Sequence, residues 1–121
     1  KAALAALLAL GCIELIERNA REIGQIGDYY HGRIVELAGE FPGVVAEARG
    51  EGHMSGMKFH RVADALEFHR RAVDGGLWLR VHAYHEGHST CLTKFGLLLD
   101  RQVADFAVGR YSALLSALSG A

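Results

Sequence analysis

Residues 44–59 read VVAEARGEGHMSGMKF, and this stretch decides the fold. A run of small and β-branched residues leads into Gly50 and Gly52, and a second run follows them. Two extended runs joined by a short glycine-containing turn are typical of a β-hairpin. The sequence therefore predicts a strand over 44–49, a tight turn over 50–52 and a second strand over 53–60.

A helix follows the hairpin. Its apolar stripe and its charged stripe recur at helical spacing over 61–74, and the pair Gly75-Gly76 ends it. Next comes a strand over 77–83. After a polar connection over 84–89, the run TCLTKFGLLL predicts another strand over 90–99, with Gly96 as a bulge or bend. Asp100 is a good N-cap for a last helix over 101–118.

The segment before the hairpin is helical. The stretch AALAALLAL at 2–10 consists of strong helix formers and is apolar all round, which predicts burial. Helical periodicity continues to Phe41, but a straight helix of that length would be roughly 60 Å long. We therefore expect a break near Asn19 or Gly24, or first turns that project from the domain. The apolar start needs a cover, so we expect a piece of something larger or an obligate oligomer.

The predicted order is α-β-β-α-β-β-α. Strands grouped in pairs between helices are typical of an α+β fold. We expect a mostly antiparallel sheet of three to four strands with helices packed on one face.

Composition excludes several classes of protein. With 121 residues, 50% of them hydrophobic, and one proline, the chain is a single domain at most and is not disordered. A formal net charge of −1 provides no field for nucleic acid or an anionic membrane, so neither is an expected partner. The longest apolar run is about half of a membrane span. Cys12 and Cys91 lack CxxC spacing, and we interpret both as reduced core residues of a cytoplasmic protein.

Seven histidines are many for this length, and three of them cluster in HAYHEGH at 82–88. Three imidazoles can hold zinc, but this spacing is not a zinc motif and would send strand neighbours to opposite faces. We therefore predict no metal site. Ser55 is not in a nucleophile elbow, and Cys91 lies among apolar residues, so no catalytic residue is assigned.

Charged residues within the strands are more informative. Lys94 interrupts an apolar strand and must face solvent, a partner or a ligand. Lys58 is placed similarly, with a stronger case for simple solvation. Arg49, beside the turn, can clamp a carboxylate with two hydrogen bonds, although arginines at strand ends mostly do nothing so specific.

Several strings together resemble the carboxyl-terminal portion of class III aminotransferases, which depend on pyridoxal phosphate. The hairpin VVAEARGEGHMSGMKF is the most specific match. The other matching strings are GCIELIERN at 11–19, AREIGQIGDYYHGRIVEL at 20–37, DGGLWLRV at 74–81 and LTKFGLLLDRQVADF at 92–106.

The resemblance implies that residues 1–18 link from a large domain and that residues 19–121 form the small domain. It implies pyridoxal 5'-phosphate in the parent enzyme, with the Schiff-base lysine outside this chain and no cofactor bound by this segment alone. The implied partners are the large domain, a second copy in a homodimer, an amino donor and a keto acceptor.

The resemblance also suggests substrate contacts. The family's arginine for the substrate carboxylate falls on Leu92, and its two prolines fall on Phe95-Gly96. Lys94, two residues further along the same strand face, can substitute as a point charge. A variable loop near the active-site mouth coincides with the histidine cluster, so His85 or His88 can touch substrate.

The resemblance implies that this segment covers the cofactor cleft, contributes to substrate binding and is inactive alone. The alternative is a free-standing α+β interaction or small-ligand-binding module that dimerises through its first helix.

Overall fold

The computed structural model describes residues 1–85 and 88–120, and in that part of the chain four helices accompany a four-stranded sheet. The elements are α1 (Ala2–Arg18), α2 (Ala20–Glu40), β1 (Val45–Glu51), β2 (Met54–Phe59), α3 (Val62–Asp74), β3 (Arg80–His82), β4 (Thr90–Leu92) and α4 (Arg101–Ser119). The α+β fold expected from the sequence is confirmed. One more helix appears in the order, because the amino-terminal helix is divided in two.

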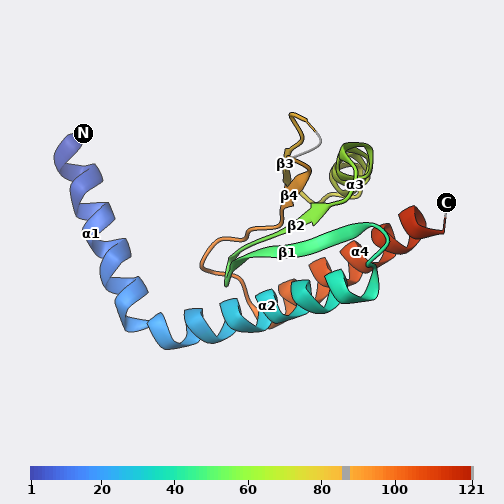
Figure 1. The fold of residues 1–121 in the computed structure, drawn as a ribbon. Coiled ribbons are helices and arrows are strands. Elements are labelled where there is room, and N and C mark those ends of the chain that lie inside the picture. The colour runs from blue at the N-terminus through green and yellow to red at the C-terminus, as the bar shows by residue number, and fades with distance from the viewer. Residues whose placement is uncertain (86–87, 121) are drawn as a thin grey trace.

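The division falls at Asn19, one of the two expected positions. The backbone there leaves helical values, with φ −107° and ψ 11°. The Asn19 side chain donates a 2.8 Å hydrogen bond to the carbonyl of Leu15, which also accepts the main-chain amide of Asn19 over 3.1 Å. Gly24 lies within α2. As a result α1 turns sharply away from α2 and stands clear of the sheet (Figure 1).

The sheet has the strand order β1-β2-β4-β3, and all three neighbouring pairs are antiparallel. Helices α2, α3 and α4 cover one face of it (Figure 1). Met57, Phe59 and Cys91 point to this covered face and are fully buried. Side chains alternate along a strand, so the intervening residues make up the opposite face, which no described helix covers. We call it the open face.

Aromatic side chains join the helices to the covered face. The ring of Phe59 in β2 lies 5.2 Å, centre to centre, from Phe68 in α3, which lies 5.8 Å from Tyr111 in α4. Tyr30 in α2 donates a hydrogen bond to the main-chain carbonyl of Thr93, just after β4. One core therefore positions both the sheet and the segment that follows it.

The hairpin forms as predicted, with its turn at Gly52 and His53 rather than over 50–52. Gly50 lies inside β1 with φ +81°, and a Cβ built there would be 1.9 Å from the carbonyl oxygen of Met54. Only glycine fits this position. The N-cap prediction for Asp100 is confirmed, since its carboxylate accepts a 2.8 Å hydrogen bond from the amide of Val103.

The strands predicted over 77–83 and 90–99 are wrong in length, because only residues 80–82 and 90–92 form the β3–β4 ladder. Beyond Leu92 the chain keeps two single hydrogen bonds to the start of the hairpin's second strand, from Thr93 to Ser55 and from Phe95 to His53. It then turns, with the amide of Leu99 donating to the carbonyl of Gly96. The predicted bend at Gly96 is therefore where the extended segment ends.

No residue of α1 is buried, and Leu4, Leu7, Leu8 and Leu10 are 62–67% exposed. Both cysteines were expected in the core, and for Cys12 in α1 this is wrong: it is exposed, whereas Cys91 is buried. The physical reason is that α1 packs against no other described helix or strand except α2. None of the described helices combines the length and apolarity that crossing a membrane requires.

Candidate functional site

Lys94 does not lie within a strand but two residues beyond the end of β4. Its neighbours Thr93 and Phe95 are held to the hairpin by main-chain hydrogen bonds of 2.9 and 3.1 Å. Thr93 is buried and Lys94 is exposed, so the alternation of the strand continues and Lys94 shares the open face with Leu92. Its ammonium group makes no hydrogen bond or ion pair with the described residues.

Arg49 lies inside β1, two positions before its end, rather than at the end of a strand. Its guanidinium forms an ion pair of 2.6 Å with Glu47 on the same strand face. The hydrogen bond from Arg49 holds the pKa of the Glu47 carboxyl below its usual value. Arg49 therefore already has a carboxylate partner, and binding a substrate carboxylate would require it to exchange that partner.

Cross-strand pairing aligns one row of residues over the open face. Arg49 pairs with Gly56, Gly56 with Leu92, and Leu92 with Arg80. Sequence reasoning did not select Arg80, because the strand that pairs with β3, and the register of that pairing, cannot be read from spacing. The alternation LWLR at 77–80 was the available signal, since it places Trp78 and Arg80 on one face.

His85 lies in the connection between β3 and β4. Its ring is 4.1 Å, centre to centre, from that of His88. Glu86, which the sequence places within this cluster, lies outside the described residues. Among the residues the structure does describe, no group of three or more His, Cys, Asp or Glu can hold a metal ion. Lys94 follows the other end of β4, so the fold does not bring His85 and Lys94 together.

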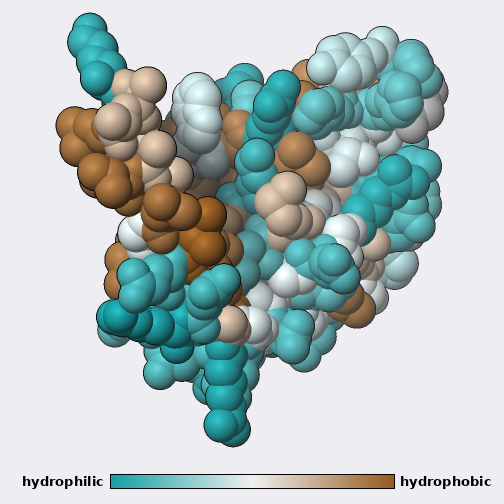
Figure 2. Space-filling model, turned by 90° about the vertical axis from the view of Figure 1, so that its left-hand side faces the viewer, coloured by the Kyte–Doolittle hydropathy of each residue, from teal (hydrophilic) through white to brown (hydrophobic). Residues whose placement is uncertain are grey.

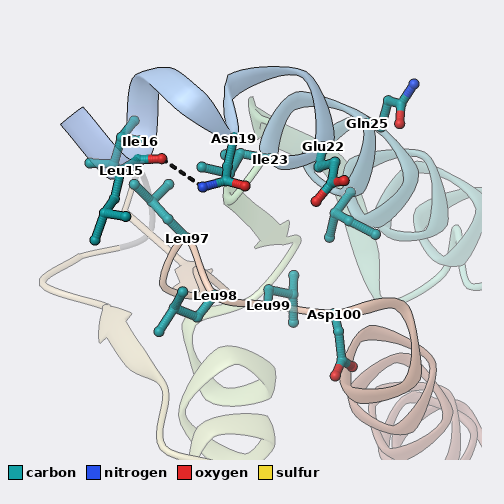
Figure 3. Close-up of a pocket in the computed structure, with 11 residues that line it drawn as sticks. Leu15, Ile16, Asn19, Glu22, Ile23, Gln25, Leu97, Leu98, Leu99 and Asp100 are labelled. Atoms are coloured by element: carbon teal, nitrogen blue, oxygen red, sulfur yellow. Dashed lines mark hydrogen bonds between the residues drawn. The ribbon is translucent and has the colours of Figure 1, made fainter. Parts of the chain in front are cut away.

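A groove of about 550 Å³ lies where α1 joins α2. Its walls are the end of α1, the first turns of α2 and residues 97–100 (Figure 3). Leu15 and Ile16 face Leu97 and Leu98 across it, and Leu98 is 99% exposed. We call it the α1–α2 groove. Figure 2 shows apolar side chains gathered along α1 and down to its junction with the rest of the molecule.

The donor set of this chain does not fit pyridoxal phosphate. No lysine or histidine lines the α1–α2 groove. Lys58 and Lys94 lie on the open face of the sheet, and Lys58 is paired across strands with Glu47. A lysine that forms a Schiff base works from a desolvated pocket, whereas Lys94 is exposed and Lys58 is only half-buried.

No family model and no curated protein matches this chain. Solved structures do. A lysine aminotransferase from M. tuberculosis matches with a TM-score of 0.74 and 25% sequence identity, over 88% of this chain and 24% of its own. An aminotransferase from Bacillus anthracis matches with a TM-score of 0.76 and 19% identity, over 91% of this chain and 27% of its own.

A third match has a different description. A phospholyase from Arthrobacter, in complex with phosphoethanolamine, matches with a TM-score of 0.77 and 18% identity, over 89% of this chain and 27% of its own. This chain therefore has the fold of a segment found in aminotransferases and spans about a quarter of their length. The expected resemblance to aminotransferases is confirmed.

Proposed function

We propose that this chain is the small carboxyl-terminal domain of a larger class III aminotransferase. Residues 1–18 link it to the large domain, and residues 19–121 form the small domain. The fold similarity carries this proposal: it extends over most of this chain but only about a quarter of the lysine aminotransferase, at 25% sequence identity.

The surface of α1 supports the proposal. Its leucines are more than half exposed, and the α1–α2 groove continues this apolar surface. Soluble proteins seldom leave so large an apolar surface in contact with water. We therefore assign this surface to contact with the large domain of the same polypeptide.

The amino-group chemistry would come from pyridoxal phosphate, which supplies an electron sink. Since the residues of this chain do not fit that group, we assign its binding, including the Schiff-base lysine, to the large domain. By itself the 121-residue chain is then inactive and binds no cofactor.

This chain would contribute to substrate binding through its open face. Lys94 is exposed and free to pair with a substrate carboxylate, while Arg49 is a second cation on the same face. His85 lies at the opposite end of β4 from Lys94, so its proposed substrate contact, from the β3–β4 connection, would be to a different part of the substrate. We propose a homodimer in the cytoplasm that exchanges an amino group between an amino donor and a keto acceptor.

The test compares the full-length product of the reading frame that contains this sequence with the 121-residue chain. Both proteins are purified, and transfer of a labelled amino group from donor amino acids to keto acids is measured with added pyridoxal phosphate. We expect transfer by the full-length product alone. A reading frame that begins near Lys1, and yields a colourless homodimer without transfer activity, would instead establish the free-standing interaction module.

A further inference from the structure

Two cations of the open face, Arg80 and Lys94, are both placed next to Leu92. Arg80 pairs directly with Leu92 across the β3–β4 ladder. Lys94 follows Leu92 by two positions on the same face. The β3–β4 ladder ends at this pair, and the chain continues extended to Lys94, so the two cations lie diagonally across the end of the ladder. By the spacing of paired strands their Cα atoms would be roughly 7–8 Å apart. Long side chains at this separation can reach a single small ligand between them.

Neither cation has a partner within the part of the chain that the structure describes. Both side chains are exposed, and neither makes an ion pair or a side-chain hydrogen bond there. Most other arginines of the sheet and α3 do have one, such as Arg49 with Glu47 and Arg70 with Glu67. Glu47 and Glu51 belong to β1, which is two strands from β4. Two like charges that form no ion pair with any described carboxylate create a site that favours an anion.

An exposed tryptophan lies beside the two cations. Trp78 is 88% exposed, whereas its neighbour Leu79 is 5% exposed and packs into the core. The alternation therefore places Trp78 on the open face with Arg80. Leu92 is half-buried between the two cations and provides an apolar floor. Tryptophan, tyrosine and arginine are enriched at the binding hot spots of protein interfaces, and here a tryptophan and an arginine are two residues apart on one face.

We propose that Arg80 and Lys94 form an oxyanion-binding subsite on the open face, in which Arg80 determines substrate specificity. The planar guanidinium of Arg80 binds a carboxylate or a phosphate monoester of the substrate through two parallel hydrogen bonds, and Lys94 adds a point charge. Leu92 and Trp78 contact the apolar part of the substrate. This inference rests on the proposed function, since it places the subsite in the substrate cleft of an aminotransferase.

The experiment measures equilibrium binding to the full-length product by calorimetry. The probes are glutarate for a carboxylate, ethyl phosphate for a phosphate monoester, and glutaramide as a neutral analogue. Arg80→Leu is expected to weaken binding of the preferred anion about 10- to 100-fold, the range for hydrogen bonds to a charged group. Binding of glutaramide should not change. The anion whose affinity falls more in Arg80→Leu shows whether the subsite prefers a carboxylate or a phosphate monoester.

Two further variants separate specific recognition from general charge. Arg80→Lys keeps the positive charge but loses the paired donors of the guanidinium, so it should recover only part of the affinity lost in Arg80→Leu. It also provides the test if Arg80→Leu does not fold. Lys58→Met removes a cation from the same face, one row away and opposite Glu47, and should change affinity less than about threefold. If wild type, Arg80→Leu and Arg80→Lys all bind glutarate with the same affinity, and likewise ethyl phosphate, the proposed subsite is refuted. Anion binding that depends on Arg80, in a protein that transfers no amino group, would support the subsite and refute the proposed function.

Discussion

The hydroxyl of Tyr30 in α2 donates a hydrogen bond to the main-chain carbonyl of Thr93, the residue just before Lys94. Thr93 is also held from the other side, because its amide and its hydroxyl both donate to the carbonyl of Ser55, over 2.9 and 3.1 Å. All three residues, Tyr30, Ser55 and Thr93, are fully buried. The helix layer therefore fixes the backbone from which Lys94 projects onto the open face.

Replacing Tyr30 by phenylalanine removes this donor and leaves the buried carbonyl of Thr93 without it. We expect Tyr30→Phe to lower the free energy of unfolding by about 1–3 kcal/mol. Urea denaturation of the 121-residue chain, followed by circular dichroism, measures the change. Tyr111→Phe is the matched control, because the Tyr111 hydroxyl is also buried but lies 3.5 Å from its partner, the Tyr30 hydroxyl. Equal losses for the two variants would show that the bond to Thr93 has no special weight.

Two glycines of α2 should respond in opposite ways to alanine. A Cβ on Gly27 would lie 2.8 Å from Nδ1 of the buried His53, whereas a Cβ on Gly24 meets nothing within 4 Å. Alanine in place of glycine normally stabilises a helix by up to about 1 kcal/mol. We therefore expect a higher urea midpoint for Gly24→Ala and a lower one for Gly27→Ala. Stabilisation by both would mean that His53 moves aside at no cost.

Much of the fold follows from the sequence, because the local signals agree with one another. The hairpin glycines Gly50 and Gly52, the apolar and charged stripes of the helix over 61–74 and the N-cap at Asp100 are all local signals. The structure confirms the elements that they predict. The lengths of the last two strands do not follow. LTKFGLLL alternates and is apolar enough to be a strand, but it leaves the ladder after Leu92, where β3 offers no residue for it to pair with.

The two cysteines should differ sharply in reactivity. Burial raises the pKa of the Cys91 thiol to about 12, and its Sγ donates to the carbonyl of Ala65 over 3.3 Å. Since the thiolate is the reactive form, iodoacetamide at neutral pH should modify only Cys12 in the folded 121-residue chain, and both thiols in urea. Mass spectrometry of the modified peptides measures this. Rapid modification of Cys91 without urea would contradict its place in the core.

Acid should weaken a charge cluster on α3. Hydrogen bonds from Arg70 and Arg71 lower the pKa of Glu67 from 4.5 to about 2. A carboxyl whose pKa is lowered by folding stabilises the fold above its usual pKa, and this contribution is lost as the pH falls from about 4.5 to about 2. The cluster lies at the surface and is only partly buried, so the effect is small and decreases with salt. Thermal midpoints over this pH range should fall less steeply for Glu67→Gln, and equal slopes would refute the prediction.

The candidate site could be predicted only in part. Both charges are visible in the sequence, because Lys94 interrupts an apolar run and Arg49 stands beside the glycine turn. Their neighbours in the fold are not visible in the sequence. Arg49 forms an ion pair with Glu47, and Arg80 is placed near Lys94 only by the register of the β3–β4 pairing. The composition of α1 predicted burial, but its exposure follows from packing that composition does not reveal: among the described helices and strands it contacts α2 alone.

Cys12 reports directly on the central claim that the rest of an aminotransferase covers α1. By helical spacing it lies on the same side as Leu8, Leu15 and Ile16, away from the exposed ion pair of Arg18 with Glu14. Leu15 and Ile16 line the α1–α2 groove, so Cys12 is part of the surface assigned to the large domain.

The decisive measurement is the rate of iodoacetamide modification of Cys12 in the folded full-length product and in the 121-residue chain, under the same conditions. The account predicts rapid modification in the 121-residue chain and slowing of at least about 100-fold in the full-length product, because burial protects a thiol. Equal rates in the two proteins would show that α1 remains exposed in the whole protein and would contradict the account.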